Sequence, residues 1–419
     1  MVGLVKYLRR ALDDLLDKVF PDVPAIAIEG AKAVGKTETA RRRVQRVLEL
    51  DDPHTLAALR ADTDALLGVD ETVLIDEWQH YPPVWDRVRR AVDRRRDLAV
   101  LLTGSATPRP GTTSHSGAGR IASLVMRPMS LTERGVAPGG IDVAKLLARE
   151  ATIEGHSPLR LPDYAEEICA SGLPGLRGIR PAALGLQLDS YLARIVDRDL
   201  PEEGVLVRRP QALMAWLTAY AAATSTLASY TAILGAATAG ETDKPSRAAT
   251  QTYRDLLARI WVLDPVPGWT TSLAPLARLK IGPRHQLLDP ALAARLLDVT
   301  PAKLLSGAPG SGKILGQLFE SLVTLCVRAR ATATGLRTSH LRTRNGDHEI
   351  DLIVENTAGR VVAIEVKLAR DPDDADVRHL HWLGDRIGER LVDKVVVTTG
   401  EYAYRRDDGV AVIPLGLLA

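Results

Sequence analysis

Residues 30–37 combine two glycines, a lysine and a threonine at the spacing of a phosphate-binding loop. They read Gly-Ala-Lys-Ala-Val-Gly-Lys-Thr and match the pattern G-x-x-x-x-G-K-[ST] completely. The glycines let the backbone curl so that successive N–H groups face phosphates, and the helix expected after the loop presents its positive end. In such a loop Lys36 reaches the β- and γ-phosphates, and the hydroxyl of Thr37 completes the shell of a magnesium ion. The predicted ATP-binding residues are Gly30, Ala31, Lys32, Ala33, Val34, Gly35, Lys36, Thr37 and Glu38.

Two acidic residues follow a short apolar run and supply the second half of a nucleotide site. The run 73–75 predicts a buried strand that ends at Asp76 and Glu77. Asp76 would hold the magnesium ion together with Thr37, directly or through water, and Glu77 would orient and deprotonate the attacking water. Two acids after a strand are usually only a solvated strand end. Here they lie roughly 40 residues beyond a complete phosphate loop, which favours the catalytic interpretation.

A third apolar run, 101–102, ends in residues that carry hydroxyl groups. Ser105 is the first choice for a residue that senses the γ-phosphate or positions water, and Thr103 is the alternative. A serine at this place would otherwise serve as the N-cap of a helix.

Two arginines flank the strand-like segment 121–126. Arg120 and Arg127 are both candidates for an arginine finger, acting in cis or in trans. Arginines are plentiful in this chain, so each one alone is more often a surface residue. Arg120 is preferred because it directly follows segment 107–119, which is rich in Pro, Gly, Ser and Thr and predicts a long mobile loop.

The C-terminal part carries a second group of charged residues. Asp351, Glu365 and Lys367 form a D…E-x-K pattern that resembles the core of metal-dependent nucleases. Strands expected at 349–356 and 360–368 are joined by a three-residue loop, a register that places Asp351 opposite Glu365 on one face. Their carboxylates could share a divalent ion that activates water, with Lys367 polarising the phosphate. The alternative is a salt bridge on a half-buried hairpin, because an E-x-K triplet is common.

Further residues belong to this nuclease hypothesis. Glu320, on a helix expected at 315–329, is a natural additional ligand. The apolar residues at 362, 364, 366 and 368 alternate with Glu365 and Lys367 and are expected to face the core. The arginines that precede the site and could contact a phosphate backbone are Arg328, Arg330, Arg337, Arg342 and Arg344.

Segment 307–313 also matches G-x-x-x-x-G-K. Ile314 follows where a magnesium-binding hydroxyl would be needed, and no apolar strand precedes the segment. The stretch 304–312 is therefore interpreted as a flexible linker rather than a second nucleotide site.

The elements expected around the phosphate loop alternate between strand and helix. Short, uniformly apolar strands at 25–28, 73–75 and 99–102 alternate with helical patterns at 4–19 and 37–47. Such strands are typical of a parallel sheet that is covered on both faces. The predicted fold class is therefore α/β, with a P-loop NTPase sheet at the start of the chain.

From about residue 160 to 300 the pattern changes to consecutive helices with Leu/Ala periodicity. Helices expected at 229–237 and 247–262, followed by a hairpin near Gly268, resemble a helix-turn-helix with a wing, which can dock in a DNA groove. The few arginines of this segment are modest for phosphate neutralisation. A helical lid packed on the ATPase is therefore an equal alternative. Three domains are predicted, at 1–150, 151–303 and 304–419.

Composition excludes several classes of protein. The chain has 419 residues, of which 46% are hydrophobic and 25% charged, unlike disordered chains, collagens and disulfide scaffolds. A net charge of +2 gives no global field toward nucleic acid or membranes. Cys169 and Cys326 fit no metal spacing and suit a reducing compartment. The N-terminal segment is charged and no apolar run approaches the ~18 residues of a membrane helix. A cytoplasmic location and no membrane partner are predicted.

Nearly the whole chain resembles the bacterial AAA-type ATP-binding proteins whose C-terminal half is a domain of unknown function. The similar segments, in the order of the family, are GAKAVGKT, VLIDEWQHYP, LLTGSA, GR followed by MRPMSLTE, SGLPG, YLARIVDRDL, TYRDLLARIWVL, HQLLDPAL, LFESLV, EIDLIVE and VVAIEVK. The family's loop usually reads GPRQVGKT; Ala31, Lys32 and Ala33 replace Pro-Arg-Gln here and leave the phosphate chemistry intact.

The resemblance implies a fold for each part. It implies an AAA-type P-loop ATPase domain at 1–150, a helical and winged-helix-like domain at 151–303, and a PD-(D/E)xK nuclease-like α/β domain at 304–419. Archaeal ATPases of similar layout share this plan.

Together these features predict an ATP hydrolase that requires Mg2+. Its cycle would be coupled to a C-terminal nuclease-like domain that binds DNA or RNA. The alternative is an ATP-dependent switch or scaffold for protein partners, in which the nuclease-like domain is inactive. A homo-oligomer fits either hypothesis if Arg120 acts in trans.

Overall fold

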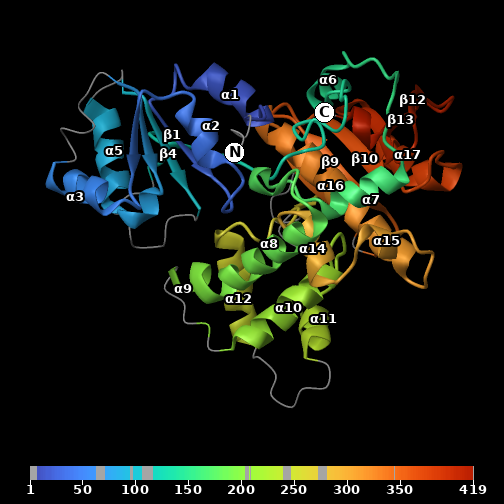
Figure 1. The fold of residues 1–419 in the computed structure, drawn as a ribbon. Coiled ribbons are helices and arrows are strands. Elements are labelled where there is room, and N and C mark those ends of the chain that lie inside the picture. Colours follow the sequence, from blue (N-terminus) through green and yellow to red (C-terminus); the bar gives the residue numbers. More distant parts are fainter. Residues whose placement is uncertain are drawn as a thin grey trace. The chain divides into compact units, whose positions relative to one another are not determined.

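The computed structural model describes residues 7–62, 71–94, 98–105, 117–202, 207, 209–238, 247–271, 281–343 and 345–418. The chain divides into two compact units, coloured along the sequence in Figure 1. The first unit contains Met1–Arg127 and Arg259–Trp261, and the second contains Pro128–Ala258 and Val262–Ala419. The first unit therefore ends before the boundary expected at residue 150. No helix among the described residues is both long and apolar enough to cross a bilayer.

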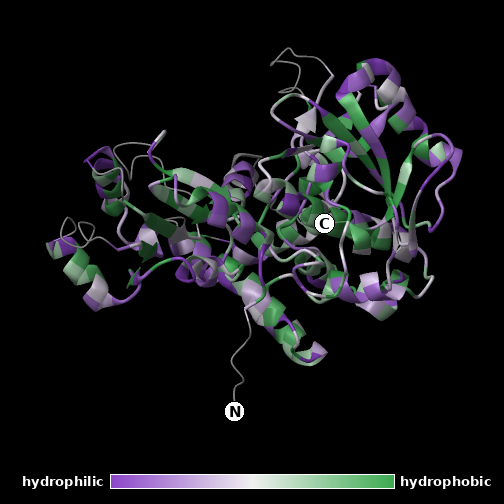
Figure 2. Ribbon diagram, turned by 90° about the horizontal axis from the view of Figure 1, so that it is seen from above, coloured by the Kyte–Doolittle hydropathy of each residue, from purple (hydrophilic) through white to green (hydrophobic). Residues whose placement is uncertain are grey.

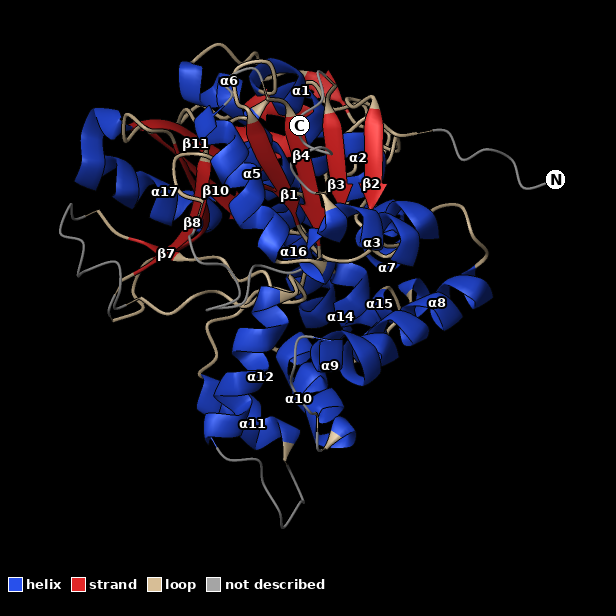
Figure 3. Ribbon diagram, turned by 90° about the vertical axis from the view of Figure 1, so that its left-hand side faces the viewer, coloured by secondary structure: helices blue, strands red, loops and turns tan. Residues whose placement is uncertain are grey.

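A five-stranded parallel sheet forms the centre of the first unit, as predicted. Its strands are β1 (Ala25–Glu29), β2 (Arg46–Glu49), β3 (Val73–Asp76), β4 (Val100–Gly104) and β5 (Ala122–Val125). Their order is β2-β3-β4-β1-β5, and every neighbouring pair is parallel (Figure 3). Every residue of β1, β3 and β4 is buried, which is the pattern of strands covered on both faces.

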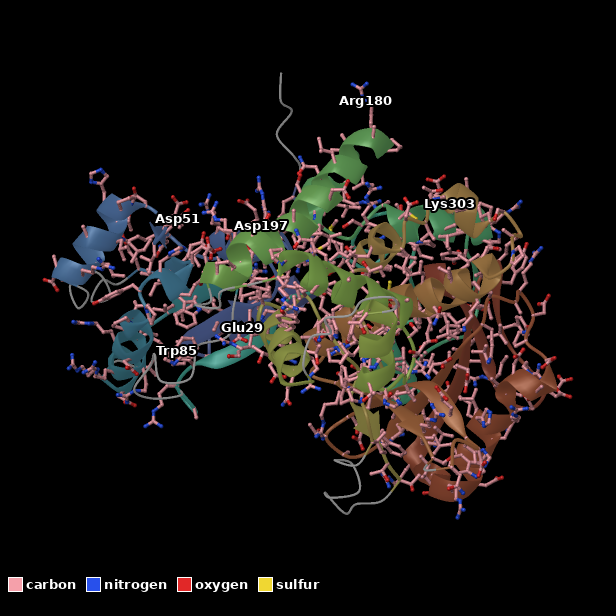
Figure 4. The ribbon with its side chains drawn as sticks, turned by 90° about the horizontal axis from the view of Figure 1, so that it is seen from below. Glu29, Asp51, Trp85, Arg180, Asp197 and Lys303 are labelled. Carbon is pink, nitrogen blue, oxygen red and sulfur yellow. The ribbon has the colours of Figure 1, made fainter. Side chains whose placement is uncertain are left out.

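Helices cover this sheet. They are α1 (Ala11–Val19), α2 (Lys36–Arg41), α3 (Pro53–Ala61), the 3₁₀ turn η1 (Trp78–His80) and α5 (Pro83–Arg94). The apolar side of α5 places Val84, Trp85 and Val88 in one core with strand residues, and Trp85 appears on this helix in Figure 4. The rings of Trp85 and Trp78 lie 4.9 Å apart. This contact fixes the turn that directly follows β3.

The helix expected at 37–47 is wrong in its second half. α2 ends at Arg41, and β2 begins at Arg46. Leu48 of β2 is buried in the core and pairs with Ile75 of β3, so tertiary pairing overrides the local helical pattern. The N-terminal helix begins at Ala11 rather than at residue 4, and residues 1–6 lie outside the described part of the chain.

An eight-stranded mixed sheet forms a large part of the second unit, and Figure 2 shows both hydrophobic and hydrophilic segments among its strands. The strands are β6 (Gly155–His156), β7 (Gly268–Trp269), β8 (Arg337–Arg342), β9 (Glu349–Glu355), β10 (Val361–Val366), β11 (Leu391–Thr398), β12 (Tyr402–Arg405) and β13 (Ala411–Pro414). Their order is β6-β12-β13-β11-β10-β9-β8-β7. Strands β6 and β7 come from the segment expected as the middle domain, so the predicted second and third domains share one sheet.

The second unit contains helices at the segments expected at 229–237, 247–262 and 315–329, together with many others. They are α6 (Val143–Ala148), α7 (Leu161–Cys169), η2 (Pro174–Leu176), α8 (Pro181–Arg194), the π-helical η3 (Ile195–Asp199), α9 (Leu200–Glu202), α10 (Pro210–Ala222), α11 (Tyr230–Ala237), α12 (Arg247–Arg259), α14 (Pro290–Leu296), α15 (Pro301–Leu304), α16 (Ser311–Ala333), α17 (Asp374–Ile387), η4 (Gly388–Arg390) and η5 (Leu415–Leu417). Helix α16 begins inside the segment expected as a linker, so that linker is shorter than predicted.

Helices α6, α16 and α17 pack against the eight-stranded sheet. Helix α17 shares a core with Val361 and Ala363 of β10. Val362 and Ile364, on the opposite face of the same strand, are also fully buried. Val362 and Ile364 are therefore buried as predicted, and the opposite face of the strand is buried as well, because helices cover both faces.

Two extended segments between α12 and α14 pair in antiparallel fashion, where the sequence predicted a hairpin. Val266 and Arg284 exchange backbone hydrogen bonds of 2.9 Å in both directions, and Leu263 pairs with Leu287. We call residues 263–266 and 284–287 the paired segments. Strand β7, which contains the predicted Gly268, pairs in parallel with β8 instead. Residues 272–280 lie outside the described part of the chain.

Candidate functional site

The carboxyl ends of β1, β3 and β4 meet at one edge of the five-stranded sheet, because neighbouring strands are parallel. Gly30 follows β1, Glu77 follows β3 and Ser105 follows β4. Since β4 lies between β1 and β3, Ser105 emerges between the other two positions. Open α/β sheets bind ligands in the crevice outside the carboxyl ends of their strands. The sheet thus brings the phosphate loop, the acidic pair and the hydroxyl residues to one place.

The loop after β1 has the curled backbone that the glycine spacing predicted. Gly30, Ala33 and Gly35 have φ angles of 143°, 66° and 101°. A Cβ at residue 30 would lie 2.3 Å from the carbonyl oxygen of Met126, so this position accepts only glycine. Helix α2 begins immediately after Gly35. The loop therefore reverses the chain sharply between a buried strand and a helix.

The other predicted loop residues differ in exposure. Ala31 and Val34 are fully buried and anchor the loop, whereas Lys32 is half-buried and Ala33 is exposed. Glu38 lies in the first turn of α2 with an exposed side chain, 4.0 Å from the guanidinium of Arg41.

Arg10 braces the phosphate loop, a contact that the sequence did not predict. Its Nη1 donates to the carbonyl oxygen of Val34 at 2.7 Å, and its Nη2 donates to that of Arg127 at 2.6 Å. The side chain lies just before α1 and is buried. Charge-assisted bonds of this kind are stronger than neutral ones. Arg10 therefore fixes the loop to the segment that follows β5.

Lys36 is buried inside the loop, with 5% of its surface exposed. Its Nζ donates to the carbonyl oxygens of Gly30 at 2.9 Å and Ala31 at 2.8 Å. Within the described part of the chain, Lys36 forms no ion pair with a carboxylate. Burial lowers the pKa of Lys36 to about 8, although Glu77 and Asp76 nearby oppose this shift. The Lys36 ammonium group therefore lies at the loop, and no carboxylate of the described residues is in contact with it.

Asp76 is the point at which loop and strands meet. Its Oδ1 accepts a hydrogen bond from Thr37 Oγ1 at 2.9 Å and another from Thr103 Oγ1. Thr37 begins the helix after the phosphate loop, and Thr103 belongs to β4. Thr103 of β4 therefore contacts Asp76. It was the alternative to Ser105 among the hydroxyl residues predicted from the sequence. Asp76 is 7% exposed.

Glu77 lies in the left-handed backbone region, with φ of 51°. Non-glycine residues rarely adopt this conformation, and such strain is common at functional sites. Gln79 Nε2 donates both to Glu77 Oε2 and to Ser105 Oγ, the latter at 3.2 Å. Gln79 therefore joins the predicted base to the predicted serine. Gln79 was not predicted from the sequence, although its place two residues after Glu77 within the similar segment VLIDEWQHYP was a usable signal.

Glu29 directly precedes the loop and was not predicted either. It is the last residue of β1 (labelled in Figure 4), and its Oε1 accepts a 2.9 Å hydrogen bond from Ser123 Oγ of β5. Burial raises the pKa of Glu29.

The two candidate arginine fingers lie at opposite ends of strand β5. Arg120 precedes β5, which starts beside Ile26 of β1, so it lies at the edge away from the phosphate loop. There its Nε donates to Asp93 Oδ1 at 2.9 Å. Arg127 follows β5 at the loop edge and is buried. The structure therefore does not bring Arg120 to the loop of its own chain.

The C-terminal group is brought together, but around an arginine. The antiparallel register of β9 and β10 pairs Ile364 with Leu352, and Glu365 and Asp351 are the next residues along the two strands, in the register that the sequence predicted. Asp351 Oδ2 accepts a 2.9 Å hydrogen bond from the Val366 N–H, and its Oδ1 accepts a 2.8 Å bond from Arg284 Nη1. Lys367 Nζ lies 3.6 Å from Glu365 Oε2.

Arg284 also contacts two further carboxylates. Its Nη1 donates to Glu320, the predicted additional ligand on α16, and its Nη2 donates to Glu349. No group of three His, Cys, Asp or Glu residues in the described ranges is arranged to hold a metal ion. The residues present therefore do not fit the divalent ion of the nuclease hypothesis, since a guanidinium lies among the carboxylates that would bind it.

Three of the arginines proposed to contact a phosphate backbone have carboxylate partners within the second unit, and of these Arg342 Nη1 lies 3.9 Å from Glu349 Oε2. Arg328 Nη2 lies 3.0 Å from Asp264 Oδ1, and Arg330 Nε donates to Asp142 Oδ2 at 3.0 Å. Arg337 and Arg342 are exposed, and Arg344 lies outside the described residues.

Comparisons with known proteins agree with the first part of this description. Residues 22–134 match the model of a family described as an AAA domain, which confirms the AAA-type domain expected there. Residues 161–303 and 315–418 match two families described as domains of unknown function, DUF8612 and DUF4143. No curated protein matches the chain. A solved structure, a Walker-type ATPase of Pyrococcus abyssi, is similar with a TM-score of 0.40 and 14% identity, covering 68% of this chain and 94% of that one.

Proposed function

We propose that the first unit binds ATP together with Mg2+ and hydrolyses it. The observation that carries this proposal is the pair of hydroxyl groups, Thr37 from the phosphate loop and Thr103 from β4, that both donate to Asp76. They join the phosphate loop to the acidic pair across the sheet edge. The match of residues 22–134 to an AAA domain supports the same assignment.

Each residue of the site has a role in this proposal. The backbone N–H groups of residues 30–37 and the Lys36 ammonium bind the phosphates. Thr37 and Asp76 would hold Mg2+, which neutralises phosphate charge, and one carboxylate with a hydroxyl and phosphate oxygens is a usual ligand set for this ion. Glu77 orients the attacking water and accepts its proton. Gln79 and Ser105 position the Glu77 carboxylate through the contacts described above.

For the second unit we propose a nucleotide-coupled role without nucleic-acid cleavage. This is the ATP-dependent switch or scaffold considered as the alternative above. The observation that favours it over an ATP-gated nuclease is Arg284, which contacts Glu320 and Asp351. DNA or RNA is the second candidate partner. The pair α11 and α12 followed by the paired segments has the layout of a winged helix, which supports that candidate.

An oligomer belongs to the same proposal. Because Arg120 lies at the sheet edge away from its own phosphate loop, any role as an arginine finger would be exerted on a second copy of the chain. The expected result for that arrangement is a fall in kcat for ATP hydrolysis in Arg120→Ala, with nucleotide binding retained.

The test is ATP hydrolysis and nuclease activity measured side by side. We expect Mg2+-dependent ATP hydrolysis that is lost in Lys36→Ala, and no cleavage of single-stranded DNA, double-stranded DNA or RNA with Mg2+ or Mn2+, with or without ATP. Binding of labelled DNA and RNA by wild type and Lys36→Ala separates a nucleic-acid partner from a protein partner. ATP hydrolysis unchanged in Lys36→Ala contradicts the first proposal, and cleavage that is lost in Asp351→Ala contradicts the second.

A further inference from the structure

Arg284 occupies the centre of the C-terminal carboxylate group. Its side chain is 3% exposed, and its two terminal nitrogens contact Glu320, Asp351 and Glu349. These three carboxylates come from α16 and β9, whereas Arg284 comes from the paired segments. We call Arg284, Glu320, Glu349, Asp351, Glu365 and Lys367 the arginine-centred cluster.

The backbone leaves Arg284 little freedom to withdraw. Its N–H and carbonyl both bond to Val266 at 2.9 Å. Close by, Arg328 Nη2 forms a 3.0 Å ion pair with Asp264 Oδ1, which fastens the first of the paired segments to α16. The neighbouring Gln286 is also buried and donates to Ser225 Oγ at 3.0 Å. The strand that presents the guanidinium is therefore fixed on both sides of it.

The arginine-centred cluster contains two cations, Arg284 and Lys367, among four carboxylates. Burial, and next the Asp351 carboxylate, raise the pKa of Glu365, and burial raises that of Glu320 to about 8. Burial alone would raise the pKa of Asp351, but Arg284 lowers it. Arg284 therefore lies against carboxylates from two elements, and Lys367 Nζ lies 3.6 Å from Glu365 Oε2.

We propose that the Arg284 guanidinium permanently takes the place of a divalent metal ion in this nuclease-like arrangement, and that removing it would open a metal site on Glu320, Asp351 and Glu365. The proposal concerns the second unit alone and does not depend on ATP hydrolysis in the first. Within the described part of the chain, Glu365 Oε1 is buried and has no hydrogen-bond partner, so it would be available to an ion. Oxygen ligands from carboxylates are those that Mg2+ and Mn2+ prefer.

The probe is Mn2+ alone, followed by the loss of its free electron paramagnetic resonance signal, without nucleotide. Wild type is compared with Arg284→Met, which keeps side-chain length without charge, and with the double variant Arg284→Met/Asp351→Asn. We expect Arg284→Met to bind one Mn2+ per chain at least about tenfold more tightly than wild type, because its carboxylates lose their internal cation. The double variant should bind like wild type.

Controls keep the result unambiguous. Asp76→Asn identifies any Mn2+ held by the first unit, and Arg295→Met removes an exposed arginine of the second unit that pairs with Asp189. Mn2+ binding by wild type that is lost in Asp351→Asn would overturn the proposal. This comparison does not need an Arg284 variant. Folded Arg284→Met that binds no more Mn2+ than Arg295→Met would overturn it too. If Arg284→Met fails to fold, Arg284→Gln replaces it, because glutamine is also uncharged but can still donate a hydrogen bond to a carboxylate.

Discussion

The phosphate-loop edge of the first unit and the arginine-centred cluster of the second unit both gather carboxylates and a buried cation, but they balance charge in different ways. Among the described residues, the Lys36 side chain donates to the carbonyl oxygens of Gly30 and Ala31, and the Asp76 carboxylate accepts from two hydroxyl groups. Arg284, in contrast, contacts carboxylates directly. A site prepared for a charged ligand keeps its own charges apart, whereas a charged group that stabilises the fold pairs them.

The largest expected effect comes from the predicted base of the first region. Glu77→Gln removes the proton acceptor but keeps a side chain that Gln79 can contact. We expect kcat for ATP hydrolysis to fall by about 10²–10⁴-fold, with nucleotide affinity unchanged. Single-turnover hydrolysis and binding of a fluorescent ATP analogue measure the two quantities. An equal loss of affinity and rate would instead show that Glu77 binds nucleotide and does not act as the base.

The second region should respond in stability rather than in hydrolysis. Arg284→Ala leaves Glu320, Glu349 and Asp351 without their shared cation, and we expect a loss of about 3–5 kcal/mol in the unfolding free energy of the second unit. Arg295→Ala, which breaks the exposed pair with Asp189, should cost only about 0–1 kcal/mol. Urea unfolding followed by tryptophan fluorescence compares them. Similar small losses in both variants would show that Arg284 is not the centre of the network.

Gln79 tests whether the contacts beyond the acidic pair matter. In Gln79→Ala the Glu77 carboxylate loses its donor and its link to Ser105, so we expect kcat to fall by about tenfold while KM stays the same. Gln79→Glu should be worse than Gln79→Ala, because a second carboxylate beside Glu77 repels it. Steady-state ATP hydrolysis separates kcat from KM. If KM rises instead, Gln79 contacts nucleotide rather than positioning Glu77.

The smallest expected effect is a pH dependence of the stability of the second unit. Burial raises the pKa of Glu320 to about 8 in the folded chain, against an ordinary 4.5, with Arg284, Asp351 and Glu349 facing it. The folded state therefore binds more protons than the unfolded state between these values, and stability falls as pH rises through this window. The slope is at most about 1.4 kcal/mol per pH unit.

Glu320→Gln provides the matched comparison for this slope. It removes the titrating carboxyl group, so unfolding of the second unit from pH 5 to 8 should become less dependent on pH than in wild type. An unchanged slope in Glu320→Gln would assign the pH dependence to another group.

The two regions also differ in how much of their structure could be predicted from the sequence. The phosphate loop is contiguous, and Asp76 follows a strand of unmistakable apolar pattern, so local spacing was enough to predict their meeting. The β9–β10 register was also predictable, because a three-residue turn fixes it. Arg284 was not, since it reaches Asp351 from 67 positions away in the chain through pairing that no local pattern encodes. Arg10 was missed for a similar reason, as it contacts a backbone carbonyl rather than a motif side chain. The prediction of a helix at 37–47 was wrong in its second half, because residues of β2 pair with β3.

The most direct test of the contrast between the two regions counts Mn2+ ions bound per chain, with and without a non-hydrolysable ATP analogue. We predict one tightly bound Mn2+ that appears only with the analogue, disappears in Lys36→Ala and Asp76→Asn, and is unaffected by Asp351→Asn. An ion that binds without nucleotide and is lost in Asp351→Asn would contradict the account, because the cluster around Arg284 would then be an open metal site.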